Sequence, residues 1–292
     1  MRISIIIVNW NTASLLEKCL DSIFNYAQNI DYEIIVIDNA SNDASQKFLS
    51  QIQNQNDKIK IIFNEKNLGF ARAVNQGTKI ASGKYVLLLN PDTEIKKNTL
   101  ENIIEWMGKN PHCGVCGGKI LNPDGTTQPS VRRFPDLFSQ SLILLKIHQF
   151  LINFLSLRRY FVLDFDYSKT QEVDQVMGAF FMIRKETIDR VGFFDENFFL
   201  WFEEVDFCKR VKETGWKIYY YPEAEIIHRG GASFSQVFSV KNQWQFNKSL
   251  LYYFKKHHCF LSYLTLLSIS PISLFFSLVV FLLPIIKKIK RI

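Results

Sequence analysis

Polar side chains follow three apolar runs of the sequence, at the points where β-strands would end. Asn9 follows the first run, Asp38 and Asn39 end the second, and Asn90 and Asp92 follow a later one. In an open α/β sheet, ligands bind beyond the carboxyl ends of the strands. One such residue alone is more often a helix cap or a turn residue. Three polar strand ends at one edge favour a binding site.

A phosphate-bearing ligand at this edge needs a metal ion, because the sequence lacks the common phosphate-binding loops. No GxGxxG motif follows the first run, where VNWNTAS stands, and GxxxxGK[ST] occurs nowhere. Mg²⁺ and Mn²⁺ prefer oxygen ligands and bridge phosphate oxygens. Asp92, directly after a central strand, is therefore the candidate metal ligand for a bound nucleotide diphosphate.

The elements that must position these residues alternate between short apolar runs and amphipathic segments. The expected strands are 3–8, 33–37, 58–63 and 85–89, and the expected helices are 15–24, 44–52, 71–80 and 100–107. Apolar runs that are continuous rather than alternating indicate a mostly parallel sheet covered by helices on both faces. The fold class is therefore α/β and Rossmann-like, continued by a strand at 115–121 and a second α/β stretch at 173–221.

Two further segments do not fit the sheet. Residues 137–160 are apolar with Lys146, Arg158 and Arg159 set among them, which predicts a helical insertion at about 136–160. This insertion either packs on the body or lies on a bilayer surface. The expected organisation is an α/β domain over 1–235 and a basic, apolar C-terminal segment over 236–292.

The charge distribution argues against a nucleic-acid binder. The chain of 292 residues has 35 Lys and Arg against 28 Asp and Glu, a net charge of +7. Nine of the cations and none of the acidic residues lie after position 225, so the body carries 26 cations against 28 anions. A nucleic-acid-binding surface requires a basic body. The excess charge belongs instead to the tail.

The tail contains 27 residues, 260–286, without a formal charge. This length is sufficient to cross a hydrocarbon core of about 30 Å as a helix, so we expect a membrane-associated C-terminus. Lysines lie close on both sides, and Pro271 and Pro284 interrupt the segment. A single span, a re-entrant segment and a surface-lying segment are all compatible with this pattern.

The N-terminus and the cysteines indicate a cytosolic body. The sequence MRISIIIVNWN has a short apolar run without a cleavage signal behind it, so we expect a first strand rather than a signal peptide. Five cysteines are an odd count that argues against a disulfide framework. Cys113 and Cys116 form one CxxC without the second pair that a structural zinc site needs, so we expect reduced, structural thiols.

Seven motifs, in order, resemble those of family 2 glycosyltransferases with a GT-A fold, in the rhamnosyltransferase-like branch that builds bacterial surface polysaccharides. The resemblance covers roughly residues 3–233. Its motifs are VNWN from Val8, VIDNASND from Val36, NLGFARAVNQG from Asn67, LLLNPDT from Leu87, GAFFMIRKE from Gly178, FFDENFFLWFEEVDFCKR from Phe193, and HRGGAS from His228.

The resemblance implies a donor site at the strand ends. Asp38 corresponds to the aspartate that contacts the nucleotide base and ribose, with Asn9 and Asn39 beside it. Arg72 lies near the donor pocket. LLLNPDT matches the DxD position, with Asn90 in place of the first acid.

The resemblance also implies a metal site for Mg²⁺ or Mn²⁺. Asp92 is the retained metal ligand of the DxD position, and His228 matches the histidine that completes the site. A lone histidine is more often structural, but Gly230 and Gly231 after it would let the backbone pass close to a diphosphate.

The motif FEEVD carries the expected catalytic base. Glu204 stands where the family usually has an aspartate, and Glu203 is the acid before it. The longer side chain leaves Glu203 or Asp206 as alternative bases, although Asp206 is expected to face inward to structural partners.

The predicted reaction is inverting transfer of a sugar, with rhamnose as one candidate, from a dTDP- or UDP-sugar to a glycan acceptor. The basic, apolar tail favours a polyprenyl-diphosphate-linked acceptor at the cytoplasmic face of a bacterial membrane, bound peripherally or by one segment. A soluble acceptor is the alternative. A non-catalytic, membrane-bound nucleotide-sugar-binding protein is the rival function, and a nucleotidyltransferase is disfavoured because no glycine-rich basic loop follows the first strand.

Overall fold

The amino-terminal half of the chain forms four neighbouring parallel strands in the order β3-β2-β1-β4. The computed structural model describes residues 2–148, 150–230 and 239–289. All four strands were expected from their continuous apolar runs. Those of β1, β2 and β4 are almost entirely buried because helices cover both faces, whereas β3, at the edge of the sheet, is only partly buried. The strands are β1 Ile3–Asn9, β2 Tyr32–Asp38, β3 Ile59–Phe63 and β4 Tyr85–Leu89.

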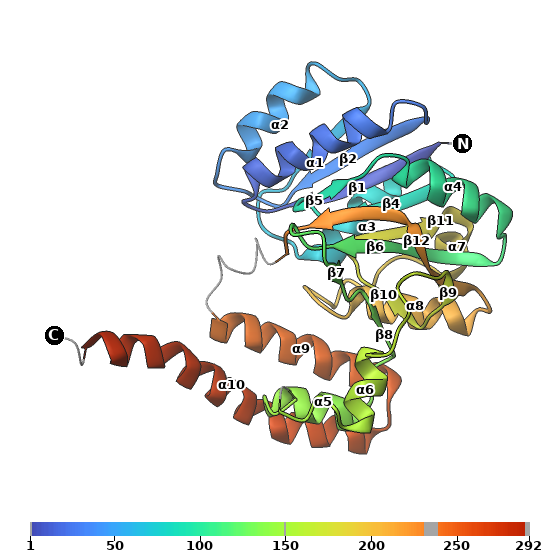
Figure 1. The fold of residues 1–292 in the computed structure, drawn as a ribbon. Coiled ribbons are helices and arrows are strands. Elements are labelled where there is room, and N and C mark those ends of the chain that lie inside the picture. Colours follow the sequence, from blue (N-terminus) through green and yellow to red (C-terminus); the bar gives the residue numbers. More distant parts are fainter. Residues whose placement is uncertain (1, 149, 231–238, 290–292) are drawn as a thin grey trace.

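Alternate residues of these strands supply two separate hydrophobic cores. Ile5 and its neighbours on one face pack with α1, α2 and α4, whereas Ile6 and its neighbours on the other face pack with α3, α7 and α8. The α/β class with helices on both faces is therefore confirmed (Figure 1). The helices are α1 Ala13–Tyr26, α2 Ser45–Gln53, α3 Phe70–Ile80, α4 Thr99–Lys109, α7 Lys185–Val191 and α8 Glu203–Glu213.

The second half of the sheet is mixed rather than parallel. Strand β11 lies between β4 and β6 and is antiparallel to both, whereas β6 and β12 are parallel. The sequence does not distinguish these cases, because every residue of β11 is buried and its apolar run is as continuous as that of a parallel strand. These strands are β5 Thr93–Ile95, β6 Cys113–Leu121, β7 Thr127–Gln128, β9 Gln171–Glu172, β11 Phe180–Arg184 and β12 Lys217–His228, and β8 Val131–Arg132 pairs separately with β10 Gln175–Val176.

Four helices form a layer beside the sheet domain (Figure 1). The predicted insertion is two helices rather than one, and the first begins at Asp136, whose side chain accepts a hydrogen bond from the Ser139 amide. The predicted domain boundary at 235/236 lies outside the described residues. The helices of this layer are α5 Leu137–Leu144, α6 Leu155–Phe161, α9 Ser239–His257 and α10 Phe260–Ile289.

Helix α10 is continuous over 30 residues and passes through both prolines. A proline inside a helix removes one hydrogen bond without reversing the chain. A re-entrant segment would reverse the chain within 260–286, and α10 does not reverse there, which favours a span or a surface-lying helix. The segment Phe260–Val279 of α10 has a mean hydropathy of 1.7, and its length and composition are those of a membrane span.

A buried polar seam joins α9 to α10. The Asn247 amide donates hydrogen bonds to Ser270 Oγ at 2.8 Å and to Ser273 Oγ at 2.7 Å. Ser277 Oγ donates to Gln243 Oε1 at 3.3 Å, and the Gln243 amide donates to Asn247 Oδ1 at 2.7 Å. Three serines of α10, Ser270, Ser273 and Ser277, are thus directed to its neighbour.

Large apolar side chains cover the opposite side of α10. In Phe260, Leu261 and Phe275 the exposed fraction reaches 71%, 72% and 62%. A helix on the surface of a water-soluble domain shows the reverse arrangement, with apolar residues inside and polar residues outside.

Candidate functional site

The parallel pairing of β1 and β2 brings Asn9 and Asp38 together at the carboxyl edge of the sheet. Asn9 Nδ2 donates a hydrogen bond to Asp38 Oδ2 at 2.9 Å. The other carboxylate oxygen of Asp38 accepts from the Ser41 amide at 2.9 Å and from Gln46 Nε2 at 3.2 Å. Both predicted residues are fully buried, so they form the floor of this edge rather than its open surface.

Asn39 fixes the loop that leads into α3. Its Oδ1 accepts from Leu68 N at 3.0 Å, and its Nδ2 donates to Asn67 Oδ1 at 2.9 Å. The loop ends at Gly69, where φ is +86° and a Cβ would lie 2.5 Å from a backbone oxygen, so only glycine fits there. Asn39 therefore positions the start of α3, the helix that carries Arg72.

Arg72 stands apart from the buried strand ends. Its side chain is 54% exposed, and its Nε lies 3.3 Å from Glu196 Oε2. A pair this exposed contributes little to stability. The guanidinium is thus available to exchange this partner for another anion.

The pairing of β5 with β12 brings Asp92 beside His228. Thr93 lies opposite His228 in the register, and His228 Nε2 lies 3.4 Å from Asp92 Oδ1. The Arg229 amide donates to the Asp92 carbonyl at 3.0 Å, which holds the two segments together. Asn90, two residues earlier, donates its backbone N–H to Ala179 O at 3.1 Å.

Gln128 sets the tautomer of His228. Gln128 Oε1 lies 2.7 Å from His228 Nδ1, and the Gln128 amide donates to Asn122 Oδ1 at 3.2 Å, which assigns its oxygen to the histidine. With the proton on Nδ1, the lone pair of Nε2 points toward Asp92.

The geometry of Asp92 and His228 fits a divalent cation. Ligand bonds of about 2.1 Å place neighbouring ligands of an octahedral ion roughly 3 Å apart, close to the observed separation. No group of three potential metal-binding side chains occurs among the residues that the structure describes. Asp92 and His228 would supply two ligands, and phosphate oxygens and water would supply the others. Gly230 has a φ of +63°, whereas Gly231 lies outside the described residues.

Glu203 and Glu204 begin α8, and only Glu204 faces a cavity. The cavity has a volume of about 170 Å³, and its lining includes Arg132 and Trp201. A Cβ at Gly178 would lie 3.9 Å from Glu204 Oε1, so the glycine leaves room beside the carboxylate. Gly178 precedes Ala179, whose backbone carbonyl accepts a hydrogen bond from Asn90 N. Through this segment the cavity adjoins β4, the strand that leads to Asp92.

Burial controls the protonation of this acidic pair. Burial raises the pKa of Glu204 above the ordinary glutamate value. Burial together with the charge of Glu204 raises the pKa of Glu203 well above that value. Glu203 is 4% exposed and does not line the cavity. Glu204, whose pKa is raised less than that of Glu203, is therefore the member of the pair that ionises more readily and that a ligand in the cavity can reach.

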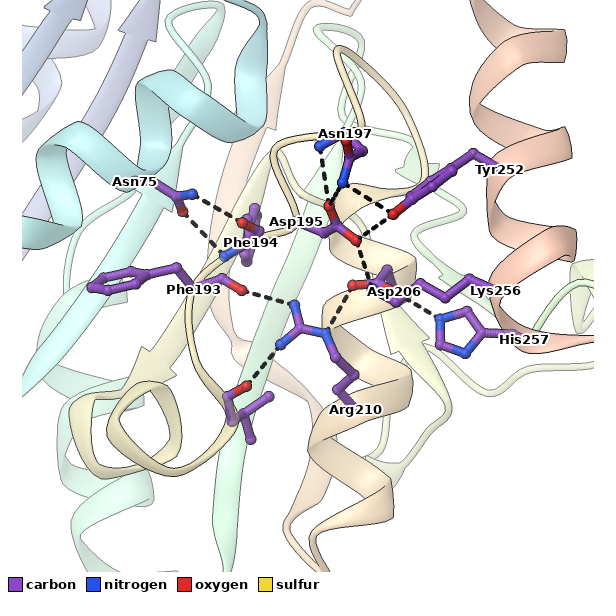
Figure 2. A network of polar contacts seen from close by, with 11 residues as sticks. Asn75, Phe193, Phe194, Asp195, Asn197, Asp206, Arg210, Tyr252, Lys256 and His257 are labelled. Carbon is purple, nitrogen blue, oxygen red and sulfur yellow. Dashed lines mark hydrogen bonds and ion pairs between the residues drawn. The ribbon is translucent and has the colours of Figure 1, made fainter.

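Asp206 is enclosed by cations and faces inward, as expected (Figure 2). Arg210 Nε lies 2.8 Å from Asp206 Oδ2, and His257 Nε2 and Lys256 Nζ each lie 2.7 Å from Oδ1. Burial alone raises the pKa of Asp206, but hydrogen bonds from His257 and Lys256 outweigh it and hold the pKa below its ordinary value. Asp206 is thus held by structural partners away from the cavity, which favours Glu204 over Asp206 as the base.

Several residues around the cavity were not predicted. Gln128 comes from a turn-rich stretch, and nothing in its local sequence indicates that it contacts His228. The cavity combines side chains from β8, α6 and α9, which are remote in sequence, so no local pattern assembles them; they are Arg132, Tyr160, Trp201 and Phe246.

Comparisons with known proteins agree with this geometry. The sequence model of glycosyl transferase family 2 matches residues 4–192. The chain is 25% identical over 240 residues to an N-acetylglucosaminyl-diphospho-decaprenol L-rhamnosyltransferase of Mycobacterium tuberculosis, covering 77% of this chain and 75% of that protein. It is 32% identical over 133 residues to a poly(ribitol-phosphate) beta-glucosyltransferase of Bacillus spizizenii, covering 44% of this chain and 20% of that protein.

Two solved structures share the fold. The structure of GalNAc-T7 with UDP, GalNAc and Mn²⁺ has a TM-score of 0.60 at 19% identity and covers 77% of this chain and 42% of its own. The mannosyltransferase PcManGT from Pyrobaculum calidifontis, in complex with GDP-Man and Mn²⁺, has a TM-score of 0.59 at 15% identity and covers 95% of this chain and 73% of its own. The expected GT-A fold is confirmed.

Proposed function

The chain belongs to glycosyl transferase family 2, and from this membership we propose that it transfers a sugar, with inversion and with a divalent metal, to a lipid-linked glycan. One observation carries the proposal. Glu204 faces a cavity beside Gly178, and the hydrogen bond between Ala179 and Asn90 joins that segment to the strand leading to Asp92. The candidate base and the candidate metal site are thus joined through hydrogen-bonded segments, and neither Asp92 nor His228 lines the cavity itself.

Asp92 and His228 would hold Mg²⁺ or Mn²⁺. When bound, the ion neutralises the charge that develops on the departing diphosphate. Both solved relatives contain Mn²⁺, which supports a divalent ion here. The Nδ1–H of His228 remains hydrogen-bonded to Gln128 Oε1, so the lone pair of Nε2 stays free for the metal ion.

Glu204 acts as the general base. Its carboxylate accepts the proton of the acceptor hydroxyl as the acceptor oxygen bonds to the anomeric carbon. The bond between that carbon and the diphosphate oxygen breaks, and the nucleoside diphosphate leaves with the bonding electrons. Attack opposite the leaving group inverts the anomeric centre.

The donor occupies the carboxyl edge of the sheet. Asp38 contacts the base and ribose of the donor. To do so it gives up its hydrogen bond with Gln46, which at 3.2 Å is the longest hydrogen bond of its side chain. Asn9 and Asn39 hold this edge in place through their side-chain hydrogen bonds. Arg72 gives up its ion pair with Glu196 and pairs with the diphosphate of the donor instead. Either dTDP or UDP is the nucleotide, and similarity to an L-rhamnosyltransferase supports rhamnose as the sugar.

The acceptor is a glycan on a polyprenyl diphosphate, and the enzyme sits at the cytoplasmic face of the membrane. The relative from Mycobacterium tuberculosis is named for a diphospho-decaprenol compound, which supports this acceptor. Helix α10 buries serines and exposes phenylalanines, as helices in lipid do, because polar contacts hold them together there. We assign the domain of 1–235 to catalysis and the segment of 236–292 to membrane attachment.

The test is release of nucleoside diphosphate from a panel of dTDP- and UDP-sugars by the full chain in detergent, with an acceptor panel and with or without Mn²⁺. Glu204→Gln is expected to lower kcat by about 10²–10⁴-fold with donor binding retained. Asp92→Asn is expected to impair both binding and turnover. Glu203→Gln, the matched control beside the cavity residue, retains turnover.

Donor binding without turnover across the acceptor panel would contradict this function. That result favours the rival function, a nucleotide-sugar-binding protein. Full activity in Glu204→Gln would instead remove Glu204 from its assigned role as the base.

A further inference from the structure

A second cavity, of about 370 Å³, lies between β8 and α6. Four arginines line it, and none of them has a role in the proposed reaction. We name this cavity the arginine cleft; its arginines are Arg132, Arg133, Arg158 and Arg159. A backbone hydrogen bond of 3.0 Å from Arg133 N to Tyr160 O holds the two sides together. The cleft is therefore built by packing between two elements rather than by a single exposed helix.

The positive charge of the cleft is only partly neutralised. Three acidic side chains also line it, and each has a cationic partner: Asp164 with Arg158, Asp174 with Arg133 and Lys212, and Glu172 with Lys217. Arg132 and Arg159 have no acidic partner within the described ranges. The Arg132 guanidinium donates to the Val131 carbonyl at 2.7 Å and lies over the Phe161 ring, and the Arg159 side chain points to solvent. Two guanidinium groups thus remain for an anion.

One side of the cleft is apolar. Leu155 lies three and four residues before Arg158 and Arg159 on α6, so the three share one side of the helix. Leu155 is 61% exposed, and Phe150 and Phe154 just before it are 85% and 50% exposed. An anion bound here would lie next to an apolar surface. This pairing fits an amphiphile with an anionic head and a hydrocarbon chain.

The cleft adjoins the cavity of the proposed base. Arg132 lines both cavities, and Glu204 lines the smaller one. A sugar attached to an anion beside Arg132 can therefore extend toward Glu204.

We propose that the arginine cleft binds the diphosphate of a polyprenyl-diphosphate-linked acceptor and directs its glycan toward Glu204. The inference rests on the proposed function, since it places the acceptor of that same reaction. The hydrocarbon chain lies along Leu155 and the exposed phenylalanines, in the membrane that α10 enters.

The test measures binding of farnesyl diphosphate, farnesol and inorganic pyrophosphate to the full chain in detergent by calorimetry, with EDTA present. Farnesyl diphosphate is expected to bind most tightly. A hydrogen bond to a charged group is worth about 10- to 100-fold in affinity. Arg132→Ala and Arg159→Ala should therefore each weaken the binding of farnesyl diphosphate by about that factor. Arg190→Ala, an exposed arginine of α7, is the matched control and leaves binding unchanged.

Two results would overturn the proposal. Equal affinities of the parent and Arg159→Ala proteins would mean that the cleft does not hold the diphosphate; this exposed side chain can be removed without unfolding the chain. Displacement of farnesyl diphosphate by UDP, together with weaker binding in Asp92→Asn, would place it in the donor site. Neither result depends on turnover, so the release assay with Glu204→Gln judges the proposed function separately.

Discussion

At the scale of single residues, Glu203 and Glu204 show how surroundings separate two identical side chains. Glu203 is buried at the start of α8 and does not line the cavity, whereas Glu204 is half-buried and does. Each of the two has one carboxylate oxygen without a hydrogen-bond partner in the described part of the chain. A buried carboxylate in this setting is more stable protonated than charged.

This environment predicts that Glu203→Gln stabilises the protein at neutral pH. The pKa of Glu203 is raised in the folded state, so its ionisation costs stability above the ordinary glutamate pKa and costs nothing below it. The gap in melting temperature between variant and parent should therefore widen by a few degrees as pH rises from 4 to 8. Glu213→Gln, on the exposed side of the same helix, is the control. A gap independent of pH would contradict the raised pKa.

A second prediction concerns Gln128, which orients His228. Removing such a partner typically weakens metal affinity by about 10–100-fold. Gln128→Ala should raise the Mn²⁺ concentration for half-maximal activity by that factor, with kcat recovered at saturating Mn²⁺. Gln171→Ala, a glutamine bonded only to the Asp166 carbonyl, should leave the Mn²⁺ dependence unchanged. If the Mn²⁺ dependence of activity were unchanged in both variants, Gln128 would not contribute to the metal site.

At the scale of elements, a polar network fastens α8 to α9 (Figure 2). Asp206 of α8 binds His257 and Lys256 of α9, and Lys256 also binds Asp195 in the preceding loop at 2.7 Å. Glu204 lies two residues before Asp206, so the helix that carries the proposed base is held by the helix that leads into α10. The tail thus contributes to the position of the base.

Asp206→Asn should therefore be strongly destabilising. Removing one partner of a buried ion pair costs about 3–5 kcal/mol, because charges are left without compensation. The stabilisation by Asp206 is present above its ordinary pKa and is lost as pH falls through the lowered folded-state value, so the loss should shrink in acid. Denaturant unfolding of the variant, beside the exposed control Asp189→Asn, measures the effect. A loss below about 0.5 kcal/mol would show that the network is not stabilising.

At the scale of the whole molecule, the chain has two surfaces of opposite character. Helices α5, α6, α9 and α10 form a layer beside the sheet domain (Figure 1). The helices that cover the sheet bury their apolar sides, whereas this layer exposes large apolar side chains. The arginine cleft lies where α6 meets the sheet domain. A bilayer against this layer would bring lipid-linked acceptors to the cleft.

This arrangement predicts that Phe275→Asp detaches the protein from membranes without unfolding it. The side chain is 62% exposed, and a charge at the centre of a membrane-inserted helix costs about 2.5–3.5 kcal/mol. Vesicle binding should therefore weaken by about 100-fold in flotation assays. Phe63→Asp, an exposed phenylalanine of β3, should bind vesicles like the parent protein. Equal loss in both variants would indicate a general effect of charge.

Much of the fold and part of the site followed from local sequence. Apolar runs and amphipathic periods are properties of neighbouring residues, so they located the parallel strands, their helices and the polar edge that holds Asn9 and Asp38. The antiparallel direction of β11, the different surroundings of Glu203 and Glu204, the partners that enclose Asp206 and the meeting of arginines from β8 and α6 were decided only by the tertiary structure. Each of these depends on which distant segments pack together, and long-range packing sets burial, strand direction and charge pairing.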